Sequence, residues 1–419
     1  MASSESPKSP AEPAEPGAEA SPPAPRRGWL NRTVLGIALA SLCSDVGHEM
    51  GTTAMPALLA ALGASPAALG LIEGVADGLS SFAKLLSGLY SDRLARRKPL
   101  AVVGYLVTAS GMASFAFATS WFHILLGRAG AWLGRGARTP VRNVLMTEAT
   151  TPETYGRAFG FERAMDSAGA VIGPLITVTL LRYGGVPLSG VFVWTLLPGL
   201  AAAALIALLV REGPHEPQPH ARLTGGLRSL PAPFKQYLVG VGIAGLGDFS
   251  NTLLILFATQ AWTPRYGADA AAQMAMAFYV GYNVVYTFAC YAAGLLADRF
   301  PKHWVLGVGY SLAVIPAVAL AWPGDSLLKF AIVFGVSGMY MGVWETLESA
   351  TAATILPKAQ RGVGFGALAT VNGLGDLASS ALVGAFWAIS PVASMTLVAT
   401  ASLVGAAVIV RTGRRVGAN

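Results

Sequence analysis

Ionisable residues recur inside apolar stretches of this sequence, at spacings that place several of them on one helix face. Asp45, His48 and Glu49 are separated by three and four positions, and Glu73 and Asp77 by four; residues three or four apart are neighbours on a helix. Further ionisable residues within apolar stretches are Lys84, Arg128, Arg135, Glu162, Arg163 and Asp166. An ionisable group at mid-bilayer costs on the order of 2.5–3.5 kcal/mol, so these groups indicate a role in handling ions, protons or charged solutes.

The composition shows what kind of chain carries these residues. Of 419 residues, 53% are hydrophobic and only 12% are charged, whereas soluble domains average about 25% charged residues. With a mean hydropathy of +0.54, the chain is neither a soluble domain nor a disordered one. The two cysteines, Cys43 and Cys290, exclude a disulfide framework and lack the spacing of a metal site.

The apolar stretches are long enough to cross a bilayer as helices, each needing about 20 residues. The sequence predicts an all-α integral membrane protein with twelve spans, at 33–59, 67–91, 99–118, 121–141, 157–181, 187–210, 234–258, 271–297, 304–322, 327–349, 362–387 and 392–410. A longer polar link in the middle of the series indicates six spans plus six.

The basic residues indicate the orientation. With the N-terminus inside, 21 Lys and Arg residues fall in inner segments and three in outer loops, as the positive-inside rule requires. Both termini are therefore expected in the cytoplasm, and nucleic acid is not expected as a partner. The predicted organisation is a disordered tail at 1–28, an N-terminal half at 29–210, a cytoplasmic linker at 211–232, a C-terminal half at 233–411 and a tail at 412–419.

Two short patterns occur twice. Gly88-x3-Asp92-Arg93 recurs 206 residues later as Gly294-x3-Asp298-Arg299, and Arg157-x2-Gly160-Phe161 recurs 204 residues later from Arg361. Such nearly equal offsets indicate a duplicated six-helix unit, an arrangement known from one large class of transporters.

At this point a family resemblance becomes specific. The stretch from Gly88 to Lys98 resembles the loop 2–3 signature of the major facilitator superfamily, with Ala95 in place of its second glycine. Gly160-x8-Gly169-x3-Gly173-Pro174 resembles the antiporter motif of that family, and Arg128 with Gly134 its motif for proton transfer. The stretch 44–50 resembles that of a poorly characterised prokaryotic branch. The resemblance implies a monomeric secondary transporter of the cell membrane that uses no cofactor.

The repeated patterns are predicted to form a gate. The resemblance implies that Asp92, beside Arg93, Arg96 and Arg97, joins span two to span eleven and holds the inner gate shut; Asp298 and Arg299 repeat the pattern. The alternative is a solvated basic loop that serves only topology. In span five, Gly160, Gly169, Gly173 and Pro174 are expected to give a closely packed, bendable helix at the interface of the halves.

The ionisable residues of the first half are predicted to carry protons. The set assigned to this role is Asp45, His48, Glu49, Glu73, Asp77, Arg128 and Asp166. Depth estimates place three acids, Asp45, Asp77 and Asp166, in a middle layer with no obvious cation, and six acids face four bases overall. Some carboxyls are thus expected to exchange protons near physiological pH. The alternative is a set of interhelical salt bridges that only fix packing.

The second half carries polar and aromatic residues that suit a substrate site. The residues assigned to it are Asp248, Asn251, Tyr279, Asn283, Tyr286, Asn372 and Asp376, while Glu345 and Glu348 lie near the inner end of span ten. The alternative is polar contact between helices.

The predicted function is proton-coupled efflux of a small organic molecule. Uptake of a metal ion or an organic anion is the alternative, since Asp45, His48 and Glu49 with Met50 are possible ligands of a divalent cation. A transporter-like sensor is a further alternative. An enzyme is not expected, because the sequence has no metalloprotease, serine-hydrolase or Walker motif.

Overall fold

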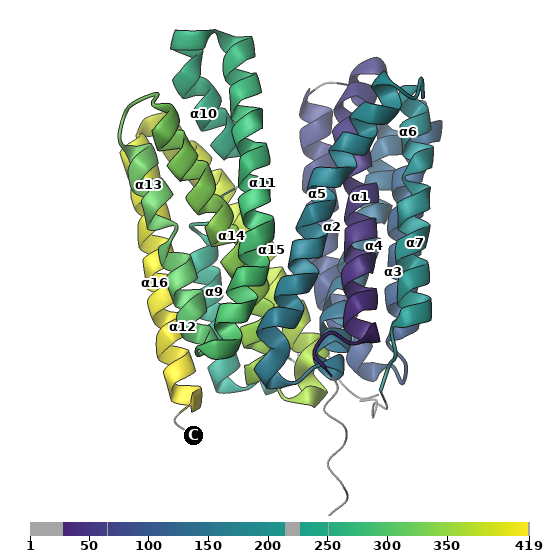
Figure 1. Ribbon diagram of the computed structural model, residues 1–419, viewed down its shortest axis with the longest axis vertical. Coiled ribbons are helices and arrows are strands. Elements are labelled where there is room, and N and C mark those ends of the chain that lie inside the picture. Colours follow the sequence, from purple (N-terminus) through teal and green to yellow (C-terminus); the bar gives the residue numbers. More distant parts are fainter. Residues whose placement is uncertain (1–27, 65, 214–226, 250, 418–419) are drawn as a thin grey trace, which may run out of the picture.

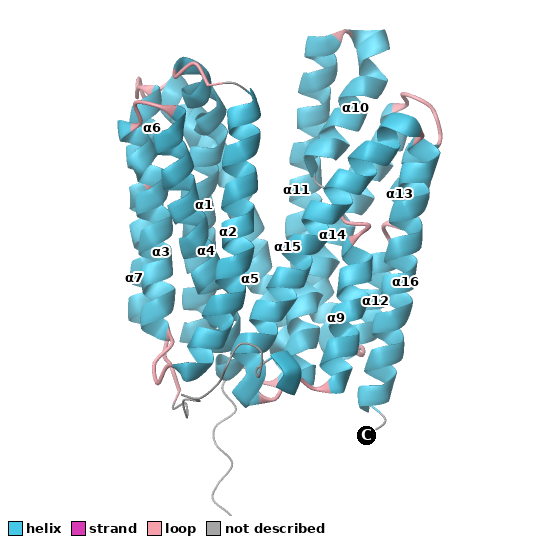
Figure 2. Cartoon of the chain, turned by 180° about the vertical axis from the view of Figure 1, so that it is seen from behind, coloured by secondary structure: helices cyan, strands magenta, loops and turns pink. Residues whose placement is uncertain are grey.

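The computed structural model describes residues 28–64, 66–213, 227–249 and 251–417, and within them all regular secondary structure is helical. The helices form two groups that stand side by side, α1 to α7 and α9 to α16 (Figure 1). The view from behind shows the same division (Figure 2). Much of the predicted N-terminal tail and linker lies outside the described residues.

The first group consists of α1 (Arg32–Ala61), α2 (Pro66–Arg93), α3 (Lys98–Ala113), η1 (Ser114–Phe117), α4 (Trp121–Ala149), η2 (Pro152–Thr154), α5 (Tyr155–Arg182), α6 (Leu188–Trp194) and α7 (Leu196–Leu209). The second group consists of α9 (Ala232–Gly245), α10 (Asn251–Tyr266), α11 (Ala268–Arg299), α12 (Lys302–Ser311), α13 (Val314–Ala321), α14 (Leu327–Ile355), η3 (Lys358–Gln360), α15 (Arg361–Ile389) and α16 (Pro391–Gly417). The last helix therefore continues into the segment predicted as a C-terminal tail.

Local sequence signals explain several helix ends. The Asn31 side chain accepts hydrogen bonds from the backbone N–H groups of Thr33 and Val34, at 3.0 and 3.1 Å, and so caps α1. Pro99 stands in the first turn of α3, where a missing N–H is tolerated. Gly267 makes the turn between α10 and α11. Its φ of +81° is a backbone conformation that residues other than glycine rarely adopt.

Each predicted span falls on a helix or on two consecutive helices, but three predicted single helices are interrupted. The stretch 234–258 is divided into α9 and α10 near Gly245 and Gly247, and glycine disfavours a continuous helix. The stretches 187–210 and 304–322 are divided just before Pro198 and Pro316, which cannot donate the hydrogen bond that would continue the preceding helix.

Seven helical segments of the described chain are long and apolar enough to cross a membrane. In Figure 1 the chain enters α1 and leaves α16 at the same, lower end of the molecule, which we call the terminal end. If the chain crosses the membrane an even number of times, both ends must lie on the same side, as they do here. That there are twelve crossings, and that the terminal end lies in the cytoplasm, stay predictions.

The two groups meet along two pairs of helices. Helices α2 and α15 lie against each other, and so do α5 and α11. Glycines permit this approach: a Cβ atom at Gly88 would stand 2.3 Å from the Gly362 carbonyl oxygen, and one at Gly294 2.3 Å from that of Gly156. These two pairs make the most extensive contact between the groups, and α5 also lies against α14 and α4 against α15.

Candidate functional site

A polar cavity of about 180 Å³ lies between the two groups. It is lined by Lys84, Arg135, Arg138, Thr139, Arg142, Asn143, Arg163, Asp166, Trp344, Glu345, Glu348, Ser349, Phe365, Leu368, Ala369, Asn372, Gly373 and Asp376. These residues come from α2, α4 and α5 on one side and from α14 and α15 on the other. The volume is below the roughly 300–1,000 Å³ of pockets that take drug-sized ligands, so the cavity suits a small solute.

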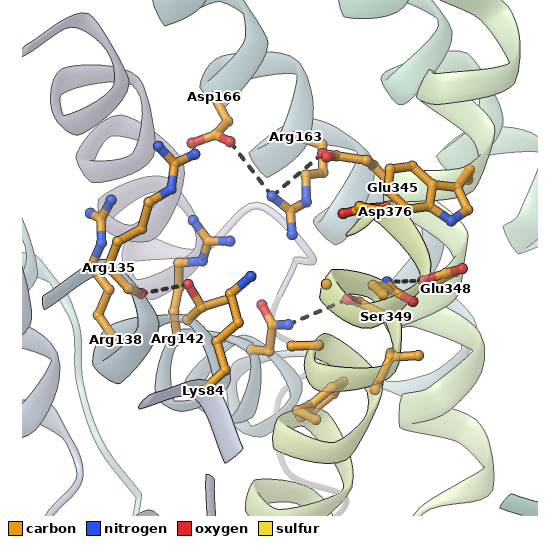
Figure 3. Close-up of a pocket in the computed structure, with 18 residues that line it drawn as sticks. Lys84, Arg135, Arg138, Arg142, Arg163, Asp166, Glu345, Glu348, Ser349 and Asp376 are labelled. Atoms are coloured by element: carbon orange, nitrogen blue, oxygen red, sulfur yellow. Dashed lines mark hydrogen bonds and ion pairs between the residues drawn. The ribbon is translucent and has the colours of Figure 1, made fainter. Parts of the chain in front are cut away.

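The two sides of the cavity differ in charge: the first group contributes five bases and one acid, Asp166, whereas the second contributes three acids (Figure 3). The basic wall comprises Lys84, Arg135, Arg138, Arg142 and Arg163, all from the first group; the acidic wall comprises Glu345, Glu348 and Asp376, all from the second. Arg163 connects the walls: its Nη1 atom lies 3.5 Å from Asp166 and 3.6 Å from Glu345. A second link between the groups is the hydrogen bond from the Asn143 amide to the Ser349 hydroxyl, at 3.3 Å.

The residues predicted to form a substrate cavity are divided among three places. Asn372 and Asp376 line the central cavity. Asp248 and Asn251 line a separate pocket of about 30 Å³ inside the second group, at the break between α9 and α10.

The other three predicted residues line neither cavity. Tyr286 donates a hydrogen bond to Glu345, at 2.7 Å, and so supports the acidic wall from behind. Asn283 donates to the Tyr279 carbonyl within α11. For these residues the structure shows polar contacts between and within helices, the alternative that the sequence left open.

Trp132 contacts three of the seven residues that were predicted to carry protons. The Arg128 guanidinium lies 3.6 Å from the Trp132 ring centre, and the His48 ring 4.7 Å from it. The indole N–H donates to Asp77 at 2.7 Å. Arg128 also donates to both carboxylate oxygens of Glu73, each at 3.0 Å, in a two-pronged ion pair.

The middle layer of acids does not lack cations, so this expectation was wrong. Arg135 lies 3.6 Å from Asp45, and Arg163 lies 3.5 Å from Asp166. The position of a residue along its helix gives the depth of its Cα atom. The long side chain of an arginine can carry its charge to a different depth in the membrane. Asp77 has the Trp132 indole instead, and Glu49 has the His48 ring at 3.4 Å.

Two further arginines of α4, Arg138 and Arg142, are buried within the first group. Arg142 donates to Glu162 at 2.7 Å and to the Ser41 hydroxyl at 2.8 Å, and that hydroxyl in turn donates to Glu162 at 2.6 Å. Arg138 lies over the Tyr105 ring, with its guanidinium carbon 3.9 Å from the ring centre. With these two residues, the six acids predicted within the spans of the first group face six bases rather than four.

Three acids of the second group, Glu348, Asp248 and Asp376, stand apart from the ion pairs of the described residues. Glu348 is 2% exposed and accepts hydrogen bonds from the Tyr310 hydroxyl and the Asn372 amide. Within the described residues, neither Glu348 nor Asp248 nor Asp376 has a lysine, arginine or histidine nitrogen within 4.0 Å. The shortage of cations predicted for the first group is thus found in the second.

The repeated Gly-x3-Asp patterns make the same contact twice, at the terminal end. Asp92, at the end of α2, accepts hydrogen bonds from the backbone N–H groups of Gly362 and Val363, at 3.1 and 2.9 Å, where α15 begins. Asp298, at the end of α11, accepts from those of Gly156 and Arg157, at 2.9 and 3.1 Å, where α5 begins. A carboxylate at a helix N-terminus is stabilised by the orphan N–H groups and by the helix dipole.

Side chains reinforce each of these two contacts, which we call the latches. Arg97 lies 3.4 Å from Asp92 and also binds Glu148, while Arg157 donates to Asp298 at 2.5 Å. Arg96 and Arg299 are exposed beside the latches, and Arg93 is partly exposed at the end of α2. The predicted pairing of Asp92 with span eleven is therefore present as a contact.

Only part of the glycine motif of α5 lies between the groups. A Cβ atom at Gly160 would stand 2.5 Å from the Cys290 carbonyl oxygen of α11. At Gly169 and Gly173 it would instead meet the Cβ atoms of Asp45 and Glu49, at 2.8 and 2.7 Å. These two glycines bring α1 and α5 together within the first group, and Pro174 lies inside α5 beside them.

Sequence reasoning missed Trp132, Arg138 and Arg142 as members of the polar core. A signal was present, because Arg135, Arg138 and Arg142 recur at spacings of three and four and so share one face of α4. Within the described residues, no three His, Cys, Asp or Glu side chains converge as a metal site would require.

The fold and the cavity define a class: helical membrane proteins with two similar halves and a polar site between them. The family model of the Major Facilitator Superfamily matches residues 37–380, and the chain belongs to that family. Its members are transporters and not enzymes.

Individual relatives add detail. The chain is 26% identical over 363 residues to an uncharacterised MFS-type transporter of Methanocaldococcus jannaschii, covering 86% of this chain and 90% of that one. It is 38% identical over 116 residues, 29% of the relative's length, to the multidrug resistance protein MdtH of Photorhabdus laumondii. The E. coli fucose:proton symporter FucP has the same fold, with a TM-score of 0.70 at 16% identity over 93% of this chain and 99% of that one.

Proposed function

We propose that the protein is a proton-coupled secondary transporter of the cell membrane that exports a small polar organic molecule by alternating access. The observation that carries this proposal is the position of the charged cavity: it lies between the two groups of helices and within two helical turns of the latches. A site between two halves that contact each other at one end is what alternating access requires.

The latches support a specific state of the cycle. Both join the groups at the terminal end, which the distribution of Lys and Arg places in the cytoplasm. The described conformation is then one in which the cytoplasmic gate is closed. Opening this gate requires that Asp92 and Asp298 leave the helix N-termini of α15 and α5. The cavity then becomes accessible from the terminal end.

The proposed coupling groups are carboxyls that lack a cationic partner. Asp45, Glu73 and Asp166 each have an arginine nitrogen within 4.0 Å. Glu49, with His48, and Asp77, with Trp132, have no lysine or arginine so close among the described residues. Since a buried carboxyl without a cation favours its neutral form, Glu348, which is 2% exposed, is suited to bind and release a proton. Glu49 and Asp77 are proposed as coupling groups because they lack a lysine or arginine partner.

Two features support export rather than uptake. The glycine motif of α5 resembles that of antiporters, and part of the chain is similar to a multidrug resistance protein. The polar cavity restricts the cargo, because its apolar lining is limited to Trp344, Phe365, Leu368 and Ala369. We therefore propose a hydrophilic organic molecule rather than a lipophilic drug.

The test uses the purified full-length protein in liposomes that enclose a pH-sensitive dye. Small hydrophilic solutes are added outside, with no proton gradient imposed. An antiporter moves protons out of the liposome as solute enters, whereas a symporter moves them in. Solute entry without a proton signal would contradict coupling, and no solute entry in any case would favour a sensor.

The variants of the test are Asp77→Asn and Glu348→Gln, with Asp269→Asn as the matched control. Asp269 is an exposed acid in the first turn of α11, outside the cavity. We expect the solute-driven proton signal to fall strongly in at least one of the first two variants and to stay unchanged in the control. An unchanged signal in both would show that these carboxyls do not couple protons to transport.

A further inference from the structure

We infer that the central cavity binds a zwitterion: a small solute with a carboxylate or phosphate at one end and an amine at the other. This inference rests on the proposed transport function and names its substrate class. The juxtaposition that carries it is the basic wall of the first group facing the acidic wall of the second across about 180 Å³ (Figure 3).

The basic wall has binding capacity that the protein itself does not use. Lys84 lines the cavity and has no carboxylate oxygen within 4.0 Å among the described residues. Arg138 is 4% exposed, and its Nε and Nη1 atoms have no hydrogen-bond partner, as is also true of Nε of Arg142. A buried guanidinium without an acceptor is costly, and an anionic group of a solute would supply the acceptor.

The acidic wall has the complementary capacity. Asp376 is exposed to the cavity that it lines, and no cation of the described chain lies within 4.0 Å of it. Glu345 stands beside it with one partner across the cavity, Arg163, at 3.6 Å. Trp344 adds an aromatic ring to the same wall, and ammonium groups bind favourably over indole rings.

The alternatives to a zwitterion fit one wall only. A simple anion would satisfy the basic wall but would stand opposite Glu345 and Asp376, which repel it. A simple cation would face Lys84 and four arginines. A neutral sugar would leave Lys84 and Asp376 without an oppositely charged partner, and desolvated charges of that kind cost far more than hydrogen bonds to hydroxyls return. A dipolar solute meets both walls and bridges the two groups of helices.

The experiment measures binding to the purified full-length protein in detergent, by thermal unfolding and by quenching of tryptophan fluorescence. The probes are β-alanine and 4-aminobutyrate as zwitterions of increasing length, phosphoethanolamine as the phosphate form, and propionate, propylamine and lactamide as anionic, cationic and neutral solutes of similar size. We expect at least one zwitterion to bind at least tenfold more tightly than all three controls. The two zwitterion chemistries separate a carboxylate from a phosphate ligand.

The variants Lys84→Gln and Asp376→Asn should each weaken zwitterion binding at least tenfold, with unchanged unfolding temperature in the absence of solute. Gln273 offers a position for a control: Gln273→Glu adds a charge on an exposed site of α11, outside the cavity, and should leave binding unchanged. Binding of propionate as tight as that of the zwitterions, or no binding of any zwitterion, would overturn the inference. Because no membrane or gradient is involved, zwitterion binding without proton movement in liposomes would contradict only the coupling.

Discussion

The two groups of helices place opposite charges at equivalent positions. The 206-residue offset that relates Asp92 to Asp298 also relates Arg142 of α4 to Glu348 of α14, and both residues line the central cavity. Arg142 is part of a buried ion pair with Glu162, whereas Glu348 is held by a tyrosine hydroxyl and an amide. One repeat therefore uses fixed ions where the other uses a carboxyl with neutral partners.

This difference teaches how a duplicated unit can divide its tasks. A buried ion pair resists a change of protonation, because losing either charge leaves the other uncompensated. A buried carboxyl with neutral donors can gain or lose a proton without breaking such a pair. The first group is accordingly suited to hold a constant charge, and the second to change its charge during transport.

The largest expected difference concerns stability. Arg142→Met leaves Glu162 with Arg163, at 3.6 Å, as its one cation within 4.0 Å among the described residues, and should lower the free energy of unfolding by about 3–5 kcal/mol. Glu348→Gln should change it by about 1 kcal/mol or less, because a glutamine has the shape and hydrogen-bonding groups of a protonated glutamate. Thermal unfolding in detergent measures both. Equal losses would mean that Glu348 is ionised and that the two halves do not differ in this way.

The next effect concerns the latches, in which the two groups should be alike. A methyl group at Gly88 or Gly294 would stand 2.3 Å from a carbonyl oxygen of the opposite helix. Such overpacking costs about 1–3 kcal/mol, which would shift the equilibrium of the gate away from its closed state about 5- to 150-fold. We expect Gly88→Ala and Gly294→Ala to reduce transport in liposomes to a similar extent.

Gly78→Ala is the control for the latch variants, since nothing lies within 4 Å of a Cβ atom there. A loss confined to one of the two latch variants would show that a single latch limits the cycle. That result would mean that the two latches, although alike in geometry, differ in their importance for transport.

A smaller effect concerns pH. A protonated Glu348 is neutral, and raising the pH would convert it to an anion that attracts the amine of a zwitterion. Solute affinity of the wild type should therefore rise with pH, by at most about tenfold per pH unit for one exchanging proton. The profile should be flat in Glu348→Gln but should keep its slope in a variant of the exposed Asp269. A slope retained in Glu348→Gln would assign the exchanging proton elsewhere.

The smallest expected effect tests whether an ion pair stabilises the protein because it is buried or simply because it is paired. Arg265 and Asp325 form an ion pair at 3.4 Å at the exposed end of the second group. Arg265→Gln should change the free energy of unfolding by about 1 kcal/mol or less, because exposed pairs are screened by water. A loss as large as that of Arg142→Met would show that pairing itself, rather than burial, governs these contacts.

The sequence was sufficient for the features that depend on short patterns. Helical spans follow from long apolar stretches, and the recurrence of Gly-x3-Asp predicted that Asp92 and Asp298 would act alike. It was not sufficient for contacts that depend on side-chain reach or on a break in a helix. Arg135 reaches Asp45 from another layer, and Asp248 occupies its own pocket because α9 ends at Gly245. Neither fact can be obtained from depth along an ideal helix.

The latches also determine which mutations the gate tolerates. In each latch the acceptor is a side chain, Asp92 or Asp298, but two of the donors are backbone N–H groups. Every amino acid except proline supplies such a donor, but a Cβ atom at Gly156 would stand 2.4 Å from the Gly294 carbonyl oxygen, and one at Gly362 would stand 2.3 Å from Asp92. Each latch is therefore specified by an aspartate and by glycines on both helices. Of the four donor positions, only 157 and 363 can change without a clash of this kind, and a change at Arg157 also removes its side-chain bond to Asp298.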